Sequence, residues 1–247
     1  MIAGNVLEIL AALVLAVCVL KAVCYPKLYQ DELSNPNSHS SFFAGCMAVS
    51  NIAAFLQPLS ENQALFLWYF SISMHISQLF TYASKQMQRF RSRARLGLPP
   101  WPLINPSMAV PIVGIVLIAS NGSVFGHTTE GIRKSVFWYA LMQCFALTVL
   151  FSIRMFVVGK SQKIARSDLP LFAIFTAPPA LLVIASTNCT KVPNQNTLIL
   201  ILFCFQMSVL FLFFGFITMN RDGYLSLTFS PSWSAMTFPS VANTLAV

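Results

Sequence analysis

The chain has 247 residues, of which 56% are hydrophobic and only 9% are charged. An ordinary soluble domain has roughly 45–50% apolar and about 25% charged residues. Seven acidic side chains are too few to solvate a soluble fold, whereas a surface in contact with lipid needs none. The composition therefore predicts an integral membrane protein and argues against a soluble enzyme. The net charge of +8 does not indicate a nucleic-acid partner, because the basic residues lie in short connectors, where orientation in a membrane explains them.

Polar connectors containing Pro and Gly divide the chain into eight apolar segments. They span about 4–24, 42–58, 63–88, 106–121, 135–158, 169–187, 196–219 and 230–247. Most are close to the roughly 20 residues that cross about 30 Å of hydrocarbon, where a backbone must satisfy its own hydrogen bonds. Each segment is therefore predicted to be a helix, including the first, which lacks the basic start of a signal peptide. Residues 1–247 are expected to form a single transmembrane domain.

The sequence contains no recognisable pattern for a metal, a cofactor or a catalytic group. The six cysteines lie mostly inside apolar segments and form no CxxC pair, which predicts packing in helices rather than a disulfide framework. A membrane enzyme would require clustered Asp, Glu or His at membrane depth, and only His75 lies well inside an apolar segment. We therefore expect neither an enzyme nor a bound cofactor.

The basic residues are distributed unequally between alternate connectors. Twelve of the 15 Lys and Arg residues follow the first, third, fifth or seventh segment, and only Arg133, Lys134 and Lys191 lie in the other connectors. Because cytoplasmic connectors of membrane proteins are enriched in Lys and Arg, connectors 85–105 and 154–168 are predicted to face the cytoplasm. Both ends of the chain would then face outward, which leaves open that a helix is missing at each end.

Four of the segments begin with a similar pattern at a nearly constant period. Their openings are separated by 65, 64 and 61 residues and read Ser41-Phe42-Phe43, Pro106-Ser107-Met108, Pro170-Leu171-Phe172 and Pro231-Ser232-Trp233. Each of the first three is followed by a longer, bulkier segment, so the predicted repeating unit is a helical hairpin.

The short segments also contain prolines, namely Pro111, Pro178, Pro179 and Pro239. A proline kinks a helix and frees a carbonyl, which membrane helices tolerate where protein or a water-filled cavity faces it. The pattern predicts an all-α fold in which an inner ring of short, kinked helices surrounds a central pore and longer helices form an outer ring. The alternative is that these prolines only accommodate tight helix packing.

Three stretches at the starts of short segments resemble motifs of one family. Residues 230–239 resemble its "WxxxTFP" stretch, residues 99–106 with Val113-Gly114-Ile115 resemble "PxWFxPxVGI", and residues 170–180 resemble "PxxAIxAAPxAL". The family comprises tellurite-resistance TehA proteins, C4-dicarboxylate (malate) transporters and plant slow anion channels. The resemblance covers nearly the whole chain, although Pro102 replaces an aromatic residue and residues 107–111 look like an insertion.

The resemblance implies ten helices in five hairpins around a central pore, usually in a homotrimer. This chain would correspond to helices 2–9 of that plan and lack the first and tenth. The implied function is transport of small anions through a pore that Phe238, flanked by Thr237 and Pro239, closes as a gate. The alternative within the same family is a proton-coupled carrier of C4-dicarboxylates such as malate, or of sulfite or tellurite.

An anion in such a pore requires weak, repeated stabilisation, because a buried Lys or Arg would hold it too tightly for release. Backbone N–H groups of kinked helices and the hydroxyls of Ser50, Thr176 and Thr237 are suitable donors. Further candidates for lining the pore are Phe43 and Phe172. His75 is either a neutral side chain hydrogen-bonded within the bundle or a proton relay. The expected partners are inorganic or carboxylate anions and the bilayer.

Overall fold

The structure is a computed structural model that describes residues 12–158, except 14 and 18, together with 170–189 and 194–222. This part of the chain is helical and contains no strand. Its α-helices are α2 (Pro26–Ser34), α3 (Pro36–Ser41), α4 (Phe43–Leu56), α5 (Glu61–Arg95), α6 (Ala109–Asn121), α7 (Glu130–Ile153), α8 (Ala177–Cys189) and α9 (Gln195–Met219). Short 3₁₀ helices η1 (Trp101–Leu103), η2 (Pro106–Met108), η3 (Gly122–Thr129) and η6 (Pro170–Thr176) and a π-helical turn η4 (Arg154–Val158) complete it.

Several helical stretches are suited to crossing a bilayer. Within the described residues, four are long and apolar enough, namely Ser38–Leu56, Pro106–Phe156, Phe172–Cys189 and Gln195–Met219. The second contains both α6 and α7, which turn back on each other through η3, where Gly126 adopts a φ of 62° that favours glycine. The 35-residue α5 is long enough, but its serines, glutamines and terminal arginines make it less apolar. The prediction of an all-helical membrane protein is confirmed.

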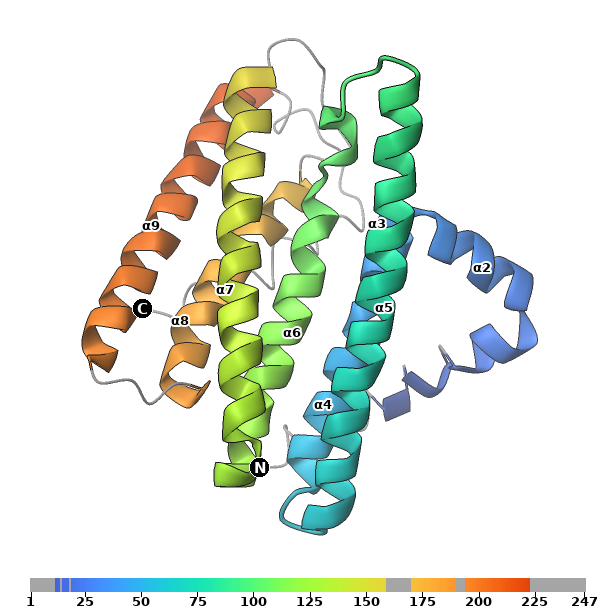
Figure 1. The fold of residues 1–247 in the computed structure, drawn as a ribbon, viewed down its shortest axis with the longest axis vertical. Coiled ribbons are helices and arrows are strands. Elements are labelled where there is room, and N and C mark those ends of the chain that lie inside the picture. Colours follow the sequence, from blue (N-terminus) through green and yellow to red (C-terminus); the bar gives the residue numbers. More distant parts are fainter. Residues whose placement is uncertain (1–11, 14, 18, 159–169, 190–193, 223–247) are drawn as a thin grey trace.

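The helices form antiparallel pairs, as the predicted hairpin repeat requires (Figure 1). In the pairs α4–α5, α6–α7 and α8–α9, a helix of 13 or 14 residues packs against one of 24 to 35 residues. The short helix α6 also packs against both α4 and α8. Among the short helices, α6 therefore lies between α4 and α8, and each short helix packs against the longer helix that follows it.

Burial separates the two layers. Nine of the 13 residues of α6 and ten of the 13 residues of α8 are buried, but only five of the 25 residues of α9. At Gly114 of α6 the absence of a side chain lets α5 approach closely, because an added Cβ would lie 2.7 Å from the His75 ring. Large side chains such as Phe211 and Phe80 are about 70% exposed on the outer helices, where lipid would cover them. The assignment of short helices to an inner layer is confirmed for α6 and α8; α4, which packs against α5 and α6 and has five of its 14 residues buried, is grouped with them as the third short helix.

The remaining predicted segments are less complete in the structure. Of the first segment, 4–24, the described residues from 12 onward are helical, and the last segment, 230–247, lies outside the described residues. The helices α2 and α3 occupy residues that the sequence analysis had assigned to a connector. Each begins with a proline, whose fixed φ suits the first position of a helix.

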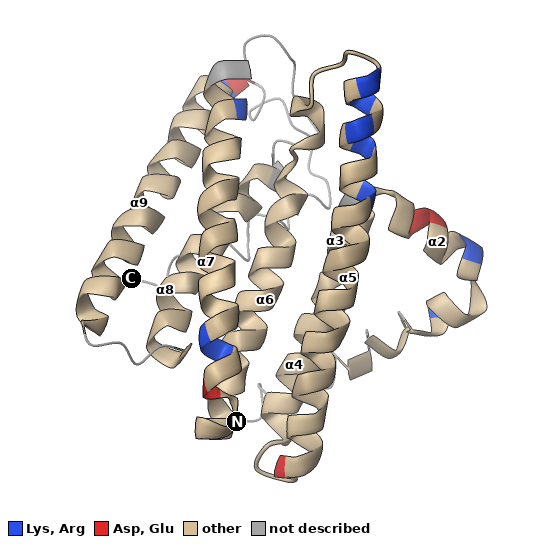
Figure 2. Ribbon diagram, viewed as in Figure 1, with Lys and Arg blue, Asp and Glu red and all other residues tan. Residues whose placement is uncertain are grey.

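The boundary of α5 was predicted incorrectly. The helix continues seven residues beyond the expected end at residue 88 and ends at Arg95, so that Arg89, Arg91, Arg93 and Arg95 lie on its last two turns. Arg, Gln and Lys are good helix formers, and positive charge is favourable at a helix C-terminus. Figure 2 shows this basic end of α5. The start of α7, which carries Arg133 and Lys134, lies at the opposite end of the bundle.

Candidate functional site

The three inner helices run in the same direction. Each of α4, α6 and α8 begins toward the end of the bundle where α5 ends, because every hairpin returns the chain to that end (Figure 1). The helices α6 and α8 are preceded there by the 3₁₀ turns η2 and η6. Helix N-termini carry partial positive charge and C-termini partial negative charge. The parallel arrangement therefore gives the two ends of the inner layer opposite electrostatic character.

The predicted proline kinks lie at the junctions between 3₁₀ and α-helical geometry. Pro111 is the third residue of α6, and Pro178 and Pro179 are the second and third residues of α8. All three are buried. A proline in the first α-helical turn lacks an N–H that this turn does not use internally. The prolines thus mark where α6 and α8 change from 3₁₀ to α-helical geometry, and they do not lie in the middle of these helices.

The two phenylalanines proposed to line the pore contact the outer helices. The ring of Phe43 lies 4.8 Å from the His75 ring of α5, measured between centroids. The ring of Phe172 stacks on Phe216 of α9 at 4.7 Å, and the guanidinium of Arg154 lies 5.8 Å from its centroid. Packing between the two layers accounts for the burial of both rings.

The hydroxyl candidates are also buried. Thr176 Oγ1 donates a hydrogen bond to the carbonyl of Ala173, 2.9 Å away, and Ser50 Oγ accepts one from Asn121 Nδ2 at 3.1 Å. Ser50 lies in α4 and Asn121 at the end of α6, so this hydrogen bond joins two inner helices. Thr237, Phe238 and Pro239 lie outside the described residues.

His75 is fully buried where α5 meets the inner layer. Its ring fills the space above Gly114 of α6, where an added Cβ would lie 2.7 Å from His75 Cε1. Neither ring nitrogen makes a hydrogen bond within the described part of the chain, although the Pro111 backbone lies within reach of the ring. The roles of hydrogen-bonded side chain and proton relay both stay predictions.

The structure brings together a polar set that the sequence analysis did not single out. We call it the amide collar; it consists of Ser50, Asn51, Ser120, Asn121, Thr187 and Asn188. Asn121 Nδ2 donates to Ser50 Oγ at 3.1 Å and to Asn51 Oδ1 at 2.6 Å, and Asn188 Nδ2 donates to Ser120 Oγ at 3.1 Å. A Ser-Asn or Thr-Asn pair thus recurs at the end of α6, near the end of α8 and in the middle of α4, a signal that aligning the repeats would have revealed.

Groups from outer elements bond the backbone carbonyls at this same end. Trp68 Nε1 donates to the carbonyl of Ile118 at 2.8 Å, and Thr129 Oγ1 donates to the carbonyl of Gly122 at 2.7 Å. Arg133, which is only 6% exposed, donates to the carbonyls of Asn188 and Gly126. The Ile118 carbonyl also accepts from the backbone N–H of Gly122, and the other carbonyls lie in η3 and at the end of α8, so these side chains add hydrogen bonds to backbone carbonyls at this end of the bundle.

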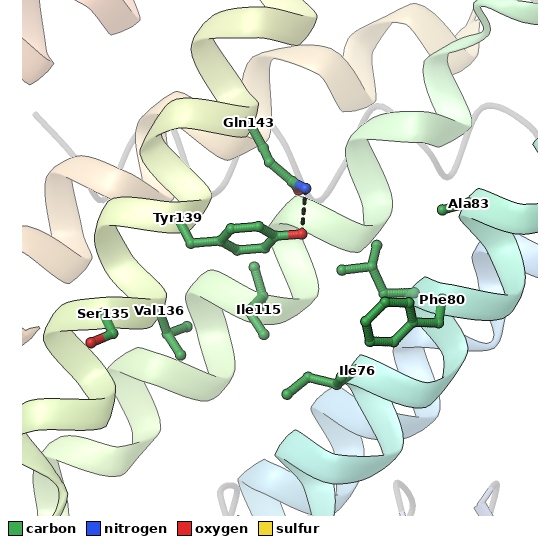
Figure 3. A pocket seen from close by; sticks show the side chains of 9 residues that line it. Ile76, Phe80, Ala83, Ile115, Ser135, Val136, Tyr139 and Gln143 are labelled. Carbon is green, nitrogen blue, oxygen red and sulfur yellow. Dashed lines mark hydrogen bonds between the residues drawn. The ribbon is translucent and has the colours of Figure 1, made fainter. Parts of the chain in front are cut away.

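A cavity lies between the two layers, among α5, α6 and α7. It has a volume of about 450 Å³ and is lined by α5, α6 and α7 (Figure 3). Tyr139 and Gln143 are hydrogen-bonded to each other in this cavity, and its other lining includes Phe80, Ile76 and Ile115. Phe80 and Tyr139 are exposed at its opening, so the cavity faces the surface that lipid would cover. Within the described residues, no group of three or more His, Cys, Asp or Glu side chains is arranged to hold a metal ion.

Comparison with known proteins agrees with this architecture. The family model described as voltage-dependent anion channel (SLAC1) matches residues 5–247, which is nearly the whole chain. No curated protein matches the chain. The family match confirms the resemblance inferred from the motifs at the starts of the short segments. Its members are anion channels and transporters rather than enzymes, and their fold is all-helical and spans the membrane. The chain therefore belongs to the voltage-dependent anion channel family and is a multi-pass membrane protein of anion transport.

Proposed function

We propose that small inorganic or carboxylate anions cross the membrane through a central pore lined by the inner helices of this chain. The observation that carries the proposal is that α4, α6 and α8 lie together, run parallel and contain no charged residue. A wall of backbone, hydroxyl and amide groups stabilises an anion weakly enough to release it. The longer helices α5, α7 and α9 would separate this wall from lipid.

We further propose that Phe238 closes the pore. Support comes from residues 233–239, whose Trp233, Thr237, Phe238 and Pro239 match the family stretch that contains the gating phenylalanine. An apolar ring in a narrow passage excludes water and leaves an anion without ligands. By the same resemblance, we expect the protein to assemble as a homotrimer.

A proton-coupled carrier of malate-like dicarboxylates, sulfite or tellurite is the second candidate. The buried His75 favours it, because an ionisable side chain inside a membrane bundle is a candidate proton relay. Anion flux into proteoliposomes distinguishes the candidates, with chloride, nitrate, sulfite, malate and tellurite tested in parallel. A channel carries anions down their own gradient whether or not a pH gradient is present. Flux that stops when the proton gradient is collapsed would favour the carrier.

We propose that the basic end of α5 faces the cytoplasm, since Lys85, Arg89, Arg91, Arg93 and Arg95 are concentrated there. A cysteine replacing Arg93 should react with a membrane-impermeant thiol reagent in inside-out vesicles but not in intact cells. Arg93 is suitable because its helix extends into the connector, and Cys24 and Cys204, which are exposed, would first be replaced by serine. Labelling of intact cells at position 93 would reverse the proposed orientation.

A further inference from the structure

The parallel inner helices create an electrostatic problem for anion passage at one end of the bundle. Each helix C-terminus carries the equivalent of about half a negative charge, and the C-termini of α4, α6 and α8 lie at the same end. An anion that enters or leaves there would meet this partial negative charge in a poorly solvated setting. A pathway for anions therefore needs a compensating positive or hydrogen-donating group at this end.

We infer that Arg133 and the amide collar together form an anion-selective mouth at the ends of α6 and α8, beside the middle of α4. The inference rests on the proposed function, because it assumes that anions travel between the inner helices. Arg133 offsets the negative helix ends, and the asparagine amides present N–H donors to the ion as it sheds water.

The charge of Arg133 is available for this role. The nearest acidic residue along the helix, Glu130, is already paired with Lys134 at 2.7 Å and with His127 at 3.0 Å. Arg133 forms no ion pair with any described residue, and its Nε has no hydrogen-bond partner there. Its guanidinium instead contacts backbone carbonyls, including that of Asn188 in the collar. A buried guanidinium without a carboxylate keeps a positive potential around it, since little water screens it.

The position of the guanidinium is fixed by its surroundings. A Cβ added to Gly122 would lie 3.0 Å from Arg133 Cδ and would overlap the Trp68 ring. Gly122 thus leaves room for the arginine stem beside the end of α6, and the hydrogen bond to Asn188 ties the head to the end of α8. Arg133 of α7 therefore bridges the ends of α6 and α8. In the inferred arrangement it lies beside the mouth, whereas an arginine inside a narrow pore would trap an ion.

The collar supplies donors at the same level. Asn121 and Asn188 link α6 to α4 and α8 to α6 through their amide nitrogens, so the ends of α6 and α8 and the middle of α4 are joined in one chain of hydrogen bonds. Asn51 and Asn188 are exposed at this end. Each amide nitrogen carries two N–H donors, and Asn188 uses one of them on Ser120. Neutral donors of this kind bind anions weakly, which permits release.

The first test removes the charge. Arg133→Gln should lower anion conductance at low salt by roughly fivefold or more, because an unscreened charge acts across several ångströms. The loss should shrink at high salt, and Arg133→Lys should recover most of the conductance. Lys134→Gln is the matched control: it removes one positive charge from the same turn of α7, but that lysine is partly exposed and paired with Glu130. Its conductance should stay near that of the wild type.

The second test adds a negative charge and does not depend on how well Arg133→Gln folds. Asn51→Asp keeps the oxygen that accepts from Asn121 and should reduce anion conductance by roughly threefold or more. Gln88→Glu adds the same charge at an exposed position near the opposite end of α5, away from the collar, and should have little effect. If Asn51→Asp and Arg133→Gln conduct like their controls while the wild type conducts anions, the inferred mouth is wrong. A folded wild type that conducts no anions would instead contradict the proposed function itself.

Discussion

Replacing Phe238 with alanine is expected to raise anion conductance severalfold or more while leaving the yield of folded protein nearly unchanged. The ring is proposed to close the pore by keeping water out, so its removal would wet the passage without altering the helix backbone or Pro239. The measurement is single-channel or macroscopic current from the purified variant in a planar bilayer, normalised to the amount of folded protein.

The expected result differs from that for an ordinary core residue. If Phe238 only packs in the core, truncation leaves a cavity that costs about 3–5 kcal/mol, and the yield should fall with no gain in current. Phe211→Ala is the matched control, since this phenylalanine is 70% exposed on α9 and should change neither quantity. Unchanged current from a well-folded Phe238→Ala protein would remove Phe238 as the gate and leave the transport function itself in place.

Replacing Trp68 with alanine is expected to destabilise the bundle by about 3–5 kcal/mol, the usual cost of removing a large buried aromatic side chain. Trp68 is fully buried, its ring centroid lies 6.0 Å from that of Phe125, and its indole N–H donates to the carbonyl of Ile118. Gly122 sits directly against the ring. The tryptophan therefore fills the space between α5 and the end of α6, and its loss leaves a cavity and removes one of the two hydrogen bonds to the Ile118 carbonyl, which still accepts from the Gly122 N–H.

The thermal unfolding midpoint in detergent is the quantity to measure for this variant. Trp68→Phe should lower the unfolding midpoint less than Trp68→Ala does. Phenylalanine keeps most of the apolar contact, so the variant loses mainly the hydrogen bond to Ile118, worth about 1 kcal/mol. Phe66→Ala, on the same helix but 69% exposed, should unfold near the wild-type temperature. Equal midpoints for Trp68→Ala and Phe66→Ala would show that the contact between α5 and α6 does not depend on this ring.

The sequence was sufficient to predict the class, the hairpin repeat and the inner layer. These follow from hydropathy, from the period of the Pro-containing openings and from the bulk of the residues between them, all of which are local properties of the chain. The bounds of α9 were predicted almost to the residue, as 196–219. This apolar helix has a polar connector before it and the polar Asn220 directly after it. The end of α5 was predicted incorrectly because an apolar segment ends at the membrane edge, whereas a helix can continue beyond it into water. The last turns of α5 are rich in Arg and Gln, which are good helix formers.

The candidate site was less predictable. Pro111, Pro178 and Pro179 were recognised from their place in the repeat, but only the structure shows that each follows a 3₁₀ turn. From the sequence, Arg133 was interpreted only as a topology signal. Its burial could not be predicted, because it depends on contacts with the carbonyls of Asn188 and Gly126, which lie 55 and 7 residues away in sequence. The collar likewise depends on contacts between helices about 70 residues apart.

The most direct test of anion transport is the reversal potential of the purified protein in a planar bilayer that separates two concentrations of potassium chloride. A pathway lined by uncharged helices and flanked by basic residues should pass chloride in preference to potassium. We therefore predict a reversal potential close to the equilibrium potential of chloride, with Phe238→Ala used to increase the current if the wild type is closed. A reversal potential close to the equilibrium potential of potassium, from protein shown to be folded, would contradict anion transport by this chain.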